Sequence, residues 1–114
     1  LNFGHTIGHA VEVCSHYEIS HGKSVAIGMS VIARASSKMG LCDKTTSEQI
    51  VSVIKSFGLP VTTGFSAKEL SAAALGDKKR SGSLITLVVP EQIGQCVLRE
   101  TPVGELEYII ALGL

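Results

Sequence analysis

The N-terminal segment constrains the fold most, because it combines a helical pattern with two glycines. Between Asn2 and Tyr17, apolar residues recur at the spacing of one helix face. Gly4 and Gly8 flank His5, and each glycine inside a helix costs roughly 0.5–1 kcal/mol relative to alanine. We therefore expect another group, either a ligand or a neighbouring helix, to approach the backbone closely at this point.

Four later segments are also predicted to be helical. Residues 24–38 are apolar on nearly every side in their first half, which is typical of a helix in the centre of a core. Capping-box patterns begin at Thr45, with Glu48, and at Ser66, with Glu69. The other three predicted helices run from Thr45 to about Phe57, from 67 to 75 and from 105 to 112.

The chain contains one predicted β-hairpin. Residues 84–89 and 95–99 are rich in β-branched side chains, and a short turn with Pro90 and Gly94 joins them. A two-stranded hairpin is marginally stable alone, so we expect it to pack on the helices. We predict a mainly α fold in which residues 1–114 form a single domain, as part of a larger protein.

Charge and cysteine content exclude several classes of protein. Ten basic residues balance ten acidic ones, so we expect neither a nucleic-acid surface nor a membrane surface. Cys14, Cys42 and Cys96 are widely spaced without a CxxC motif, which argues against a disulfide scaffold and a thiolate zinc site. This cysteine content favours a reducing, cytoplasmic setting. No apolar run approaches the ~20 residues of a membrane-spanning helix.

The histidines are the candidate functional residues. His5 and His9 are four apart, which on a helix places both imidazoles on one face, and Glu12 continues that face. Antiparallel packing of the next helix would bring His21 near them. The spacing offers these four residues as two or three metal ligands and one acid or base, without assigning the roles. We interpret His16 as a surface or capping residue.

Two long motifs carry a family resemblance. The segments NFGHTIGHAVE at 2–12 and HGKSVAIGM at 21–29 resemble the signature pair of the 3-dehydroquinate synthase family, and DKK at 77–79 and VVPEQIGQ at 88–95 fit the same family. The resemblance implies a helical C-terminal domain whose NAD-binding N-terminal domain is absent. It implies conversion of 3-deoxy-D-arabino-heptulosonate 7-phosphate to 3-dehydroquinate and phosphate, in the shikimate pathway of aromatic amino-acid biosynthesis. We expect the isolated fragment to be inactive.

The resemblance also assigns roles to the three histidines. It implies that His5 and His21 are ligands of zinc, or of another divalent metal such as Co²⁺, and that the third ligand is a glutamate outside this chain. His9 is implied to be a catalytic acid/base residue that contacts the substrate. Because catalytic zinc usually has three protein ligands, we expect the fragment to bind zinc weakly, if at all.

Substrate binding is implied for Asn2 and for a lysine of the DKK segment, either Lys78 or Lys79, near the substrate phosphate. Simpler interpretations remain for each. Asn2 fits the N-cap of the first helix, and Lys78, Lys79 and Arg80 fit a solvated basic helix end.

Lys23 departs from the family pattern, in which we expect HGE rather than HGK. One interpretation is that the family's glutamate supports a ligand histidine, so that Lys23 alters metal affinity. The other, which we favour because the histidine and the glycine are kept, is that Lys23 points to solvent.

The resemblance implies a sugar-phosphate substrate, the chain's own N-terminal domain as partner, and a homodimer of the full-length enzyme. Two alternatives stay open. One is another sugar-phosphate cyclase of the same superfamily, and the other is a non-catalytic helical packing or oligomerisation module.

Overall fold

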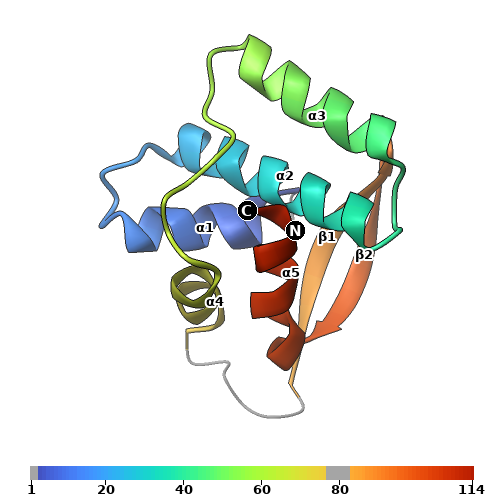
Figure 1. Ribbon diagram of the computed structural model, residues 1–114. Coiled ribbons are helices and arrows are strands. Elements are labelled where there is room, and N and C mark those ends of the chain that lie inside the picture. Colours follow the sequence, from blue (N-terminus) through green and yellow to red (C-terminus); the bar gives the residue numbers. More distant parts are fainter. Residues whose placement is uncertain (1–2, 77–82) are drawn as a thin grey trace.

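The computed structural model describes residues 3–76 and 83–114, which form a helical bundle with one hairpin against it (Figure 1). This arrangement confirms the predicted mainly α fold. The helices are α1 (His5–Cys14), α2 (His21–Lys38), α3 (Lys44–Ser56), α4 (Ala67–Leu75), the 3-10 turn η1 (Val103–Glu105) and α5 (Leu106–Gly113). The strands are β1 (Leu84–Gln92) and β2 (Gln95–Pro102).

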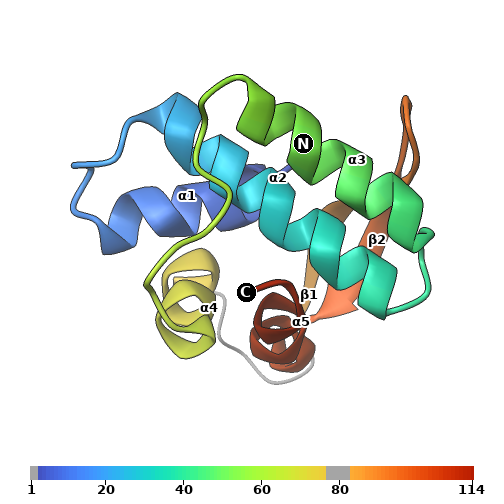
Figure 2. The same cartoon turned by 45° about the horizontal axis from the view of Figure 1, so that its top comes forward.

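Helix α2 is the centre of the bundle. It contacts α1, α3, α5 and β1, and Figure 2 shows it running between α1 and α3. Its buried positions are small or β-branched, as the all-round apolar pattern predicts. The helix begins at His21 rather than at the predicted Ser24, because the Ser20 side chain accepts a hydrogen bond from the Lys23 amide and caps it.

Glycines allow α1 and α2 to pack backbone to backbone. A Cβ atom on Gly8 would lie 3.0 Å from the Val25 Cα, and one on Gly28 would lie 2.6 Å from the Gly8 amide nitrogen and overlap the Gly4 carbonyl oxygen. Gly4 also has a φ of 80°, which disfavours any side chain. The group that approaches the glycines of the first helix is therefore a neighbouring helix.

The prediction of a first helix from Asn2 to Tyr17 was too long at both ends. Gly4 in the left-handed conformation is the N-cap of α1, so the interpretation of Asn2 as that cap was wrong. At the other end His16 and Tyr17 have φ values of 55° and 61°, which end the helix after Cys14. Apolar periodicity does not report such backbone reversals.

One predicted cap is confirmed and one was wrong. Ser66 and Glu69 form the predicted capping box before α4. Helix α3 is instead capped by Asp43, whose carboxylate accepts a hydrogen bond from the Thr46 amide at 2.7 Å. Hydrogen bonds from Thr46 lower the pKa of Asp43, because they stabilise its charged form. Aspartate competes well with threonine as a cap, which explains the shift to Asp43.

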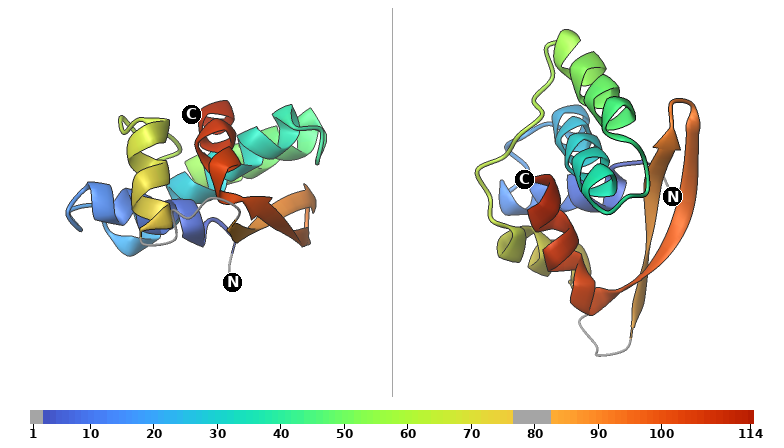
Figure 3. Two further views of the ribbon diagram at one scale, coloured as in Figure 1. Left: turned by 90° about the horizontal axis from the view of Figure 1, so that it is seen from below. Right: turned by 45° about the vertical axis from the view of Figure 1, so that its right-hand side comes forward.

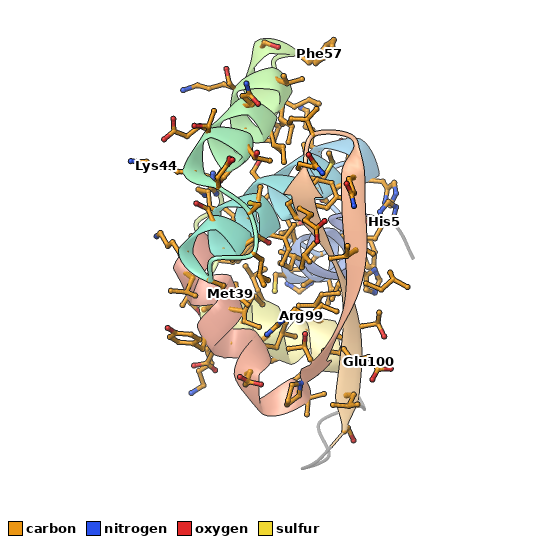
Figure 4. The ribbon with its side chains drawn as sticks, turned by 90° about the vertical axis from the view of Figure 1, so that its right-hand side faces the viewer. His5, Met39, Lys44, Phe57, Arg99 and Glu100 are labelled. Carbon is orange, nitrogen blue, oxygen red and sulfur yellow. The ribbon has the colours of Figure 1, made fainter. Side chains whose placement is uncertain are left out.

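The hairpin is longer than predicted and lies on one side of the bundle (Figure 3). Leu87 and Val89 are buried against the helices, which confirms that the hairpin packs on them. The register pairs Leu87 with Arg99, and it shifts between Pro90 and Gln92. Figure 4 shows Arg99 and Glu100 on opposite sides of β2, as strand alternation requires.

Arg34 of α2 joins two distant segments to the core. Its Nε donates a hydrogen bond to the Gly113 carbonyl at 2.6 Å, and Nη2 donates to the Val61 carbonyl at 2.7 Å. Burial lowers the pKa of the guanidinium, which nevertheless stays charged at neutral pH. One cation therefore holds both α5 and the α3–α4 connection against α2.

Two further observations concern membrane-spanning helices and the cysteines. Within residues 3–76 and 83–114, no helix is long and apolar enough to cross a membrane. Cys14, Cys42 and Cys96 are all free thiols.

We predict that Gly28→Ala destabilises the protein by about 1–3 kcal/mol, because the added methyl group forces α1 away from α2. Gly22→Ala in the same helix is the control: nothing lies within 4 Å of its Cβ position, so stability should rise by at most ~1 kcal/mol. Urea unfolding of both variants measures the difference. Equal midpoints for the two would contradict the tight crossing.

We predict that Arg34→Lys costs about 1.5–3 kcal/mol, since a single ammonium replaces a fork that reaches two carbonyls. Arg99→Lys is the matched control, because Arg99 is exposed on β2. Thermal unfolding should show a lower midpoint for the first variant only; a similar loss in both would show that the two hydrogen bonds of Arg34 are not decisive.

Candidate metal and substrate site

His5 and His21 come together although they are the first residues of two different helices. Their ring centroids lie 5.4 Å apart, with the rings edge to face at 65°. The packing of α1 against α2 brings the two rings this close (Figure 1). Figure 4 places His5 at the edge of the molecule, on the far side of the hairpin from Lys44 of α3. The expectation that packing returns His21 to the first helix is confirmed.

Glu12 contacts His21 directly. Its Oε1 lies 2.8 Å from the His21 Nδ1, within hydrogen-bond distance. The Glu12 side chain is 14% exposed, whereas that of His21 is 64% exposed. The mostly buried carboxylate of Glu12 thus contacts Nδ1 of the exposed His21 ring. The structure gives the other ring nitrogen, Nε2, no hydrogen-bond partner among the described residues.

The short connection between α1 and α2 sets this contact. The Ser15 hydroxyl donates to the Glu12 carbonyl at 3.0 Å and accepts from the Ile19 amide at 3.2 Å. The left-handed residues His16 and Tyr17 turn the chain, and the Tyr17 amide donates to the same Glu12 carbonyl at 2.8 Å. Sequence reasoning missed Ser15; its position after the last helical residue was the available signal. His16 is exposed at this helix end, as interpreted.

The two histidines fit part of a metal site. The Nδ1 of His5 is buried and has no hydrogen-bond partner among the described residues. Such a buried polar atom calls for a water, an ion or another ligand, and neutral imidazole is a preferred ligand of zinc. The described part of the chain contains no group of three or more His, Cys, Asp or Glu residues that could hold a metal. Within the described residues, His5 and His21 could therefore supply only part of a metal site.

Cys14 and Cys42 are unsuited to the same task. Burial raises the pKa of the Cys14 thiol and of the Cys42 thiol, with further increases from Glu69 and Asp43 respectively. A raised pKa disfavours the thiolate that binds metals or attacks substrates. These two thiols are therefore poorer candidate ligands than the imidazole nitrogens of His5 and His21.

The structure describes only some of the other predicted site residues. His9 is exposed on α1, and the structure gives it no hydrogen bond or ion pair within the described residues. Asn2, Lys78 and Lys79 lie outside the described residues. The structure brings His5 and His21 together, and His9 lies one turn beyond His5 on α1 with its side chain exposed.

Lys23 is exposed beside a groove of about 650 Å³. The groove lies between the start of α2 and the α3–α4 connection, and its walls include Ile19, Ile27 and Phe65. The structure gives the Lys23 side chain no hydrogen bond or ion pair to any described residue. This position fits the interpretation that Lys23 points to solvent. The carboxylate that contacts His21 is that of Glu12.

Comparisons with known proteins agree on the family. The family described as 3-dehydroquinate synthase C-terminal matches residues 1–80. The 3-dehydroquinate synthase of Streptococcus suis is 43% identical over 112 residues, and that of Enterococcus faecalis is 41% identical over 112 residues. Each match covers 96% of this chain, which spans about a third of the length of these curated relatives.

A solved structure shares the fold. A 2-deoxy-scyllo-inosose synthase, crystallised with carbaglucose-6-phosphate, NAD⁺ and Co²⁺, superposes with a TM-score of 0.78 at 20% sequence identity. The match covers 98% of this chain and 33% of that chain. The fold, the two histidine motifs and the match over residues 1–80 lead to one conclusion: the chain belongs to the 3-dehydroquinate synthase family and corresponds to its C-terminal part.

Proposed function

We propose that this chain supplies the metal-binding side of the active site of a 3-dehydroquinate synthase. The reaction is the conversion of 3-deoxy-D-arabino-heptulosonate 7-phosphate to 3-dehydroquinate with release of phosphate. The observation that carries the proposal is the meeting of His5 and His21, each from one of the two family motifs. Identity of 43% to a named 3-dehydroquinate synthase supports the choice of substrate.

His5 and His21 would hold a divalent metal through neutral imidazole nitrogens, together with a third ligand from outside the described residues. The unpartnered Nδ1 of His5 and the Co²⁺ in the related 2-deoxy-scyllo-inosose synthase both support this role. When bound, the metal supplies Lewis-acid stabilisation of negative charge on substrate oxygens. The glycine contact between α1 and α2 keeps the two imidazoles close without a metal.

His9 would work on the substrate rather than on the metal. It lies one turn beyond His5 on α1 and is exposed, so its ring is free to contact a substrate and to accept or donate a proton. Asn2 and either Lys78 or Lys79 would bind the substrate phosphate, a task for which lysine offers a compact cation with three donors. NAD, the expected cofactor, would be bound mainly by residues outside this chain.

A second candidate is a different sugar-phosphate cyclase with the same histidine motifs. The TM-score of 0.78 to 2-deoxy-scyllo-inosose synthase favours it, because the same fold supports another cyclisation. The identity to that enzyme is only 20%, against 43% to the S. suis protein.

The substrate decides between these candidates. We expect the full-length protein, supplied with NAD and Zn²⁺, to release phosphate from 3-deoxy-D-arabino-heptulosonate 7-phosphate and not from glucose 6-phosphate. We expect the 114-residue chain alone to release none, since two histidines make an incomplete site. Phosphate assays with both substrates test this; release from glucose 6-phosphate alone would favour the second candidate.

Substitution of single histidines separates metal binding from proton transfer. In the full-length protein, His5→Ala and His21→Ala should each lose bound zinc, whereas His9→Ala should keep it and lose activity by roughly 10²–10⁴-fold. Elemental analysis measures the zinc, and phosphate release measures the activity. Lys55→Ala, at an exposed position on α3, is the control and should change neither. A His9→Ala protein without zinc would contradict the assignment.

A further inference from the structure

We propose that Glu12 is a positioning residue that fixes the tautomer and the direction of the His21 ring. The inference rests on the proposed role of His21 as a metal ligand, and it gives Glu12 a role that the sequence left undecided among ligand, acid and base. The carboxylate holds the Nδ1–H of His21, so that the Nε2 lone pair is available to a metal.

The chemistry of the two groups dictates this assignment. An ionised carboxylate can only accept hydrogen bonds, so the nitrogen that faces it must carry the hydrogen. The Oε1 of Glu12 lies 2.8 Å from Nδ1, so the neutral His21 ring has its hydrogen on Nδ1 and none on Nε2. A histidine ligand that donates its second N–H to a carboxylate is both oriented and more basic.

The exposure of the two side chains argues against a purely structural pair. The His21 side chain is 64% exposed, and a hydrogen bond at so open a position contributes little to stability. An exposed ring without a partner would sample several rotamers. The main effect of Glu12, which is only 14% exposed, is therefore to order a ring that packing does not hold.

The turn between α1 and α2 stabilises the contact between Glu12 and His21. His16 and Tyr17 both have left-handed backbones, which are strained for residues other than glycine. Hydrogen bonds from Tyr17 and Ser15 to the Glu12 carbonyl hold this conformation. The strained turn thus ties the residue that carries the carboxylate to the segment that leads to His21.

Titration with Co²⁺ tests the proposal. The metal-free full-length protein is titrated with Co²⁺ alone, and the visible absorption of the ion reports its affinity. Glu12→Met removes the acceptor and keeps helix propensity, and we expect it to weaken binding 10–100-fold. Glu12→Gln keeps an oxygen acceptor and should lose less. Glu18→Gln is the charge-matched control, at an exposed position just after the turn, and should bind like the parent.

The tautomer gives a readout that needs neither metal nor activity. Imidazole ¹⁵N spectra of the metal-free parent are recorded about two pH units above the ordinary histidine pKa of ~6.5, with His21→Ala to assign the signal. We expect the hydrogen of His21 on Nδ1. A hydrogen on Nε2 in the parent would overturn the proposal, whether or not the Glu12 variants fold.

The outcomes separate this inference from the proposed function. If the parent does not bind Co²⁺, or if His21→Ala binds it as tightly as the parent, the metal site itself is refuted. If His21→Ala abolishes binding but Glu12→Met leaves it unchanged, only the role of Glu12 is refuted. Weaker binding in Glu12→Met, with partial recovery in Glu12→Gln and the Nδ1–H tautomer in the parent, supports it.

Discussion

The backbone contact between α1 and α2 is the constraint on which the rest of the structure depends. Three glycines, Gly4, Gly8 and Gly28, let the two helices approach more closely than any side chain would allow. The loss of helix propensity at these positions is offset by close packing, since dispersion energy accumulates over many short contacts. Helices α3 and α5 and strand β1 also pack on α2, whereas α4 packs on α1 and α5.

The sequence predicted the elements better than their ends. Sequence patterns located α1 to α5 and the hairpin, because burial of one face is a property that a linear pattern records, but they did not indicate the short turn η1. They misplaced the ends of α1 and the starts of α2 and α3, where the outcome depends on single backbone conformations and on competition between caps. The capping box of Ser66 and Glu69 fixed the start of α4, and the predicted ends of α2 at Lys38 and of α4 at Leu75 were also correct.

The candidate site, too, was predicted from the sequence only in part. The motifs singled out His5 and His21, and the structure brings these residues together. Helical spacing alone would have grouped His5 with His9 and Glu12, since neighbours at i+3 and i+4 are what a single helix reveals. The contact of Glu12 with His21 depends on a turn of left-handed residues other than glycine, which sequence patterns rarely predict. The positions of Asn2, Lys78 and Lys79 stay predictions.

The hydrogen bonds of Arg34 have a consequence for how this fold can change over evolution. Both acceptors are backbone carbonyls, so the attachment does not depend on which side chains residues 61 and 113 carry. Val61 is therefore free to be replaced by other residues that keep the local backbone. Gly113 is not, because a Cβ there would overlap the Val31 carbonyl oxygen. Of the two residues whose carbonyls Arg34 binds, Val61 can diverge in sequence, whereas Gly113 is fixed by its contact with Val31.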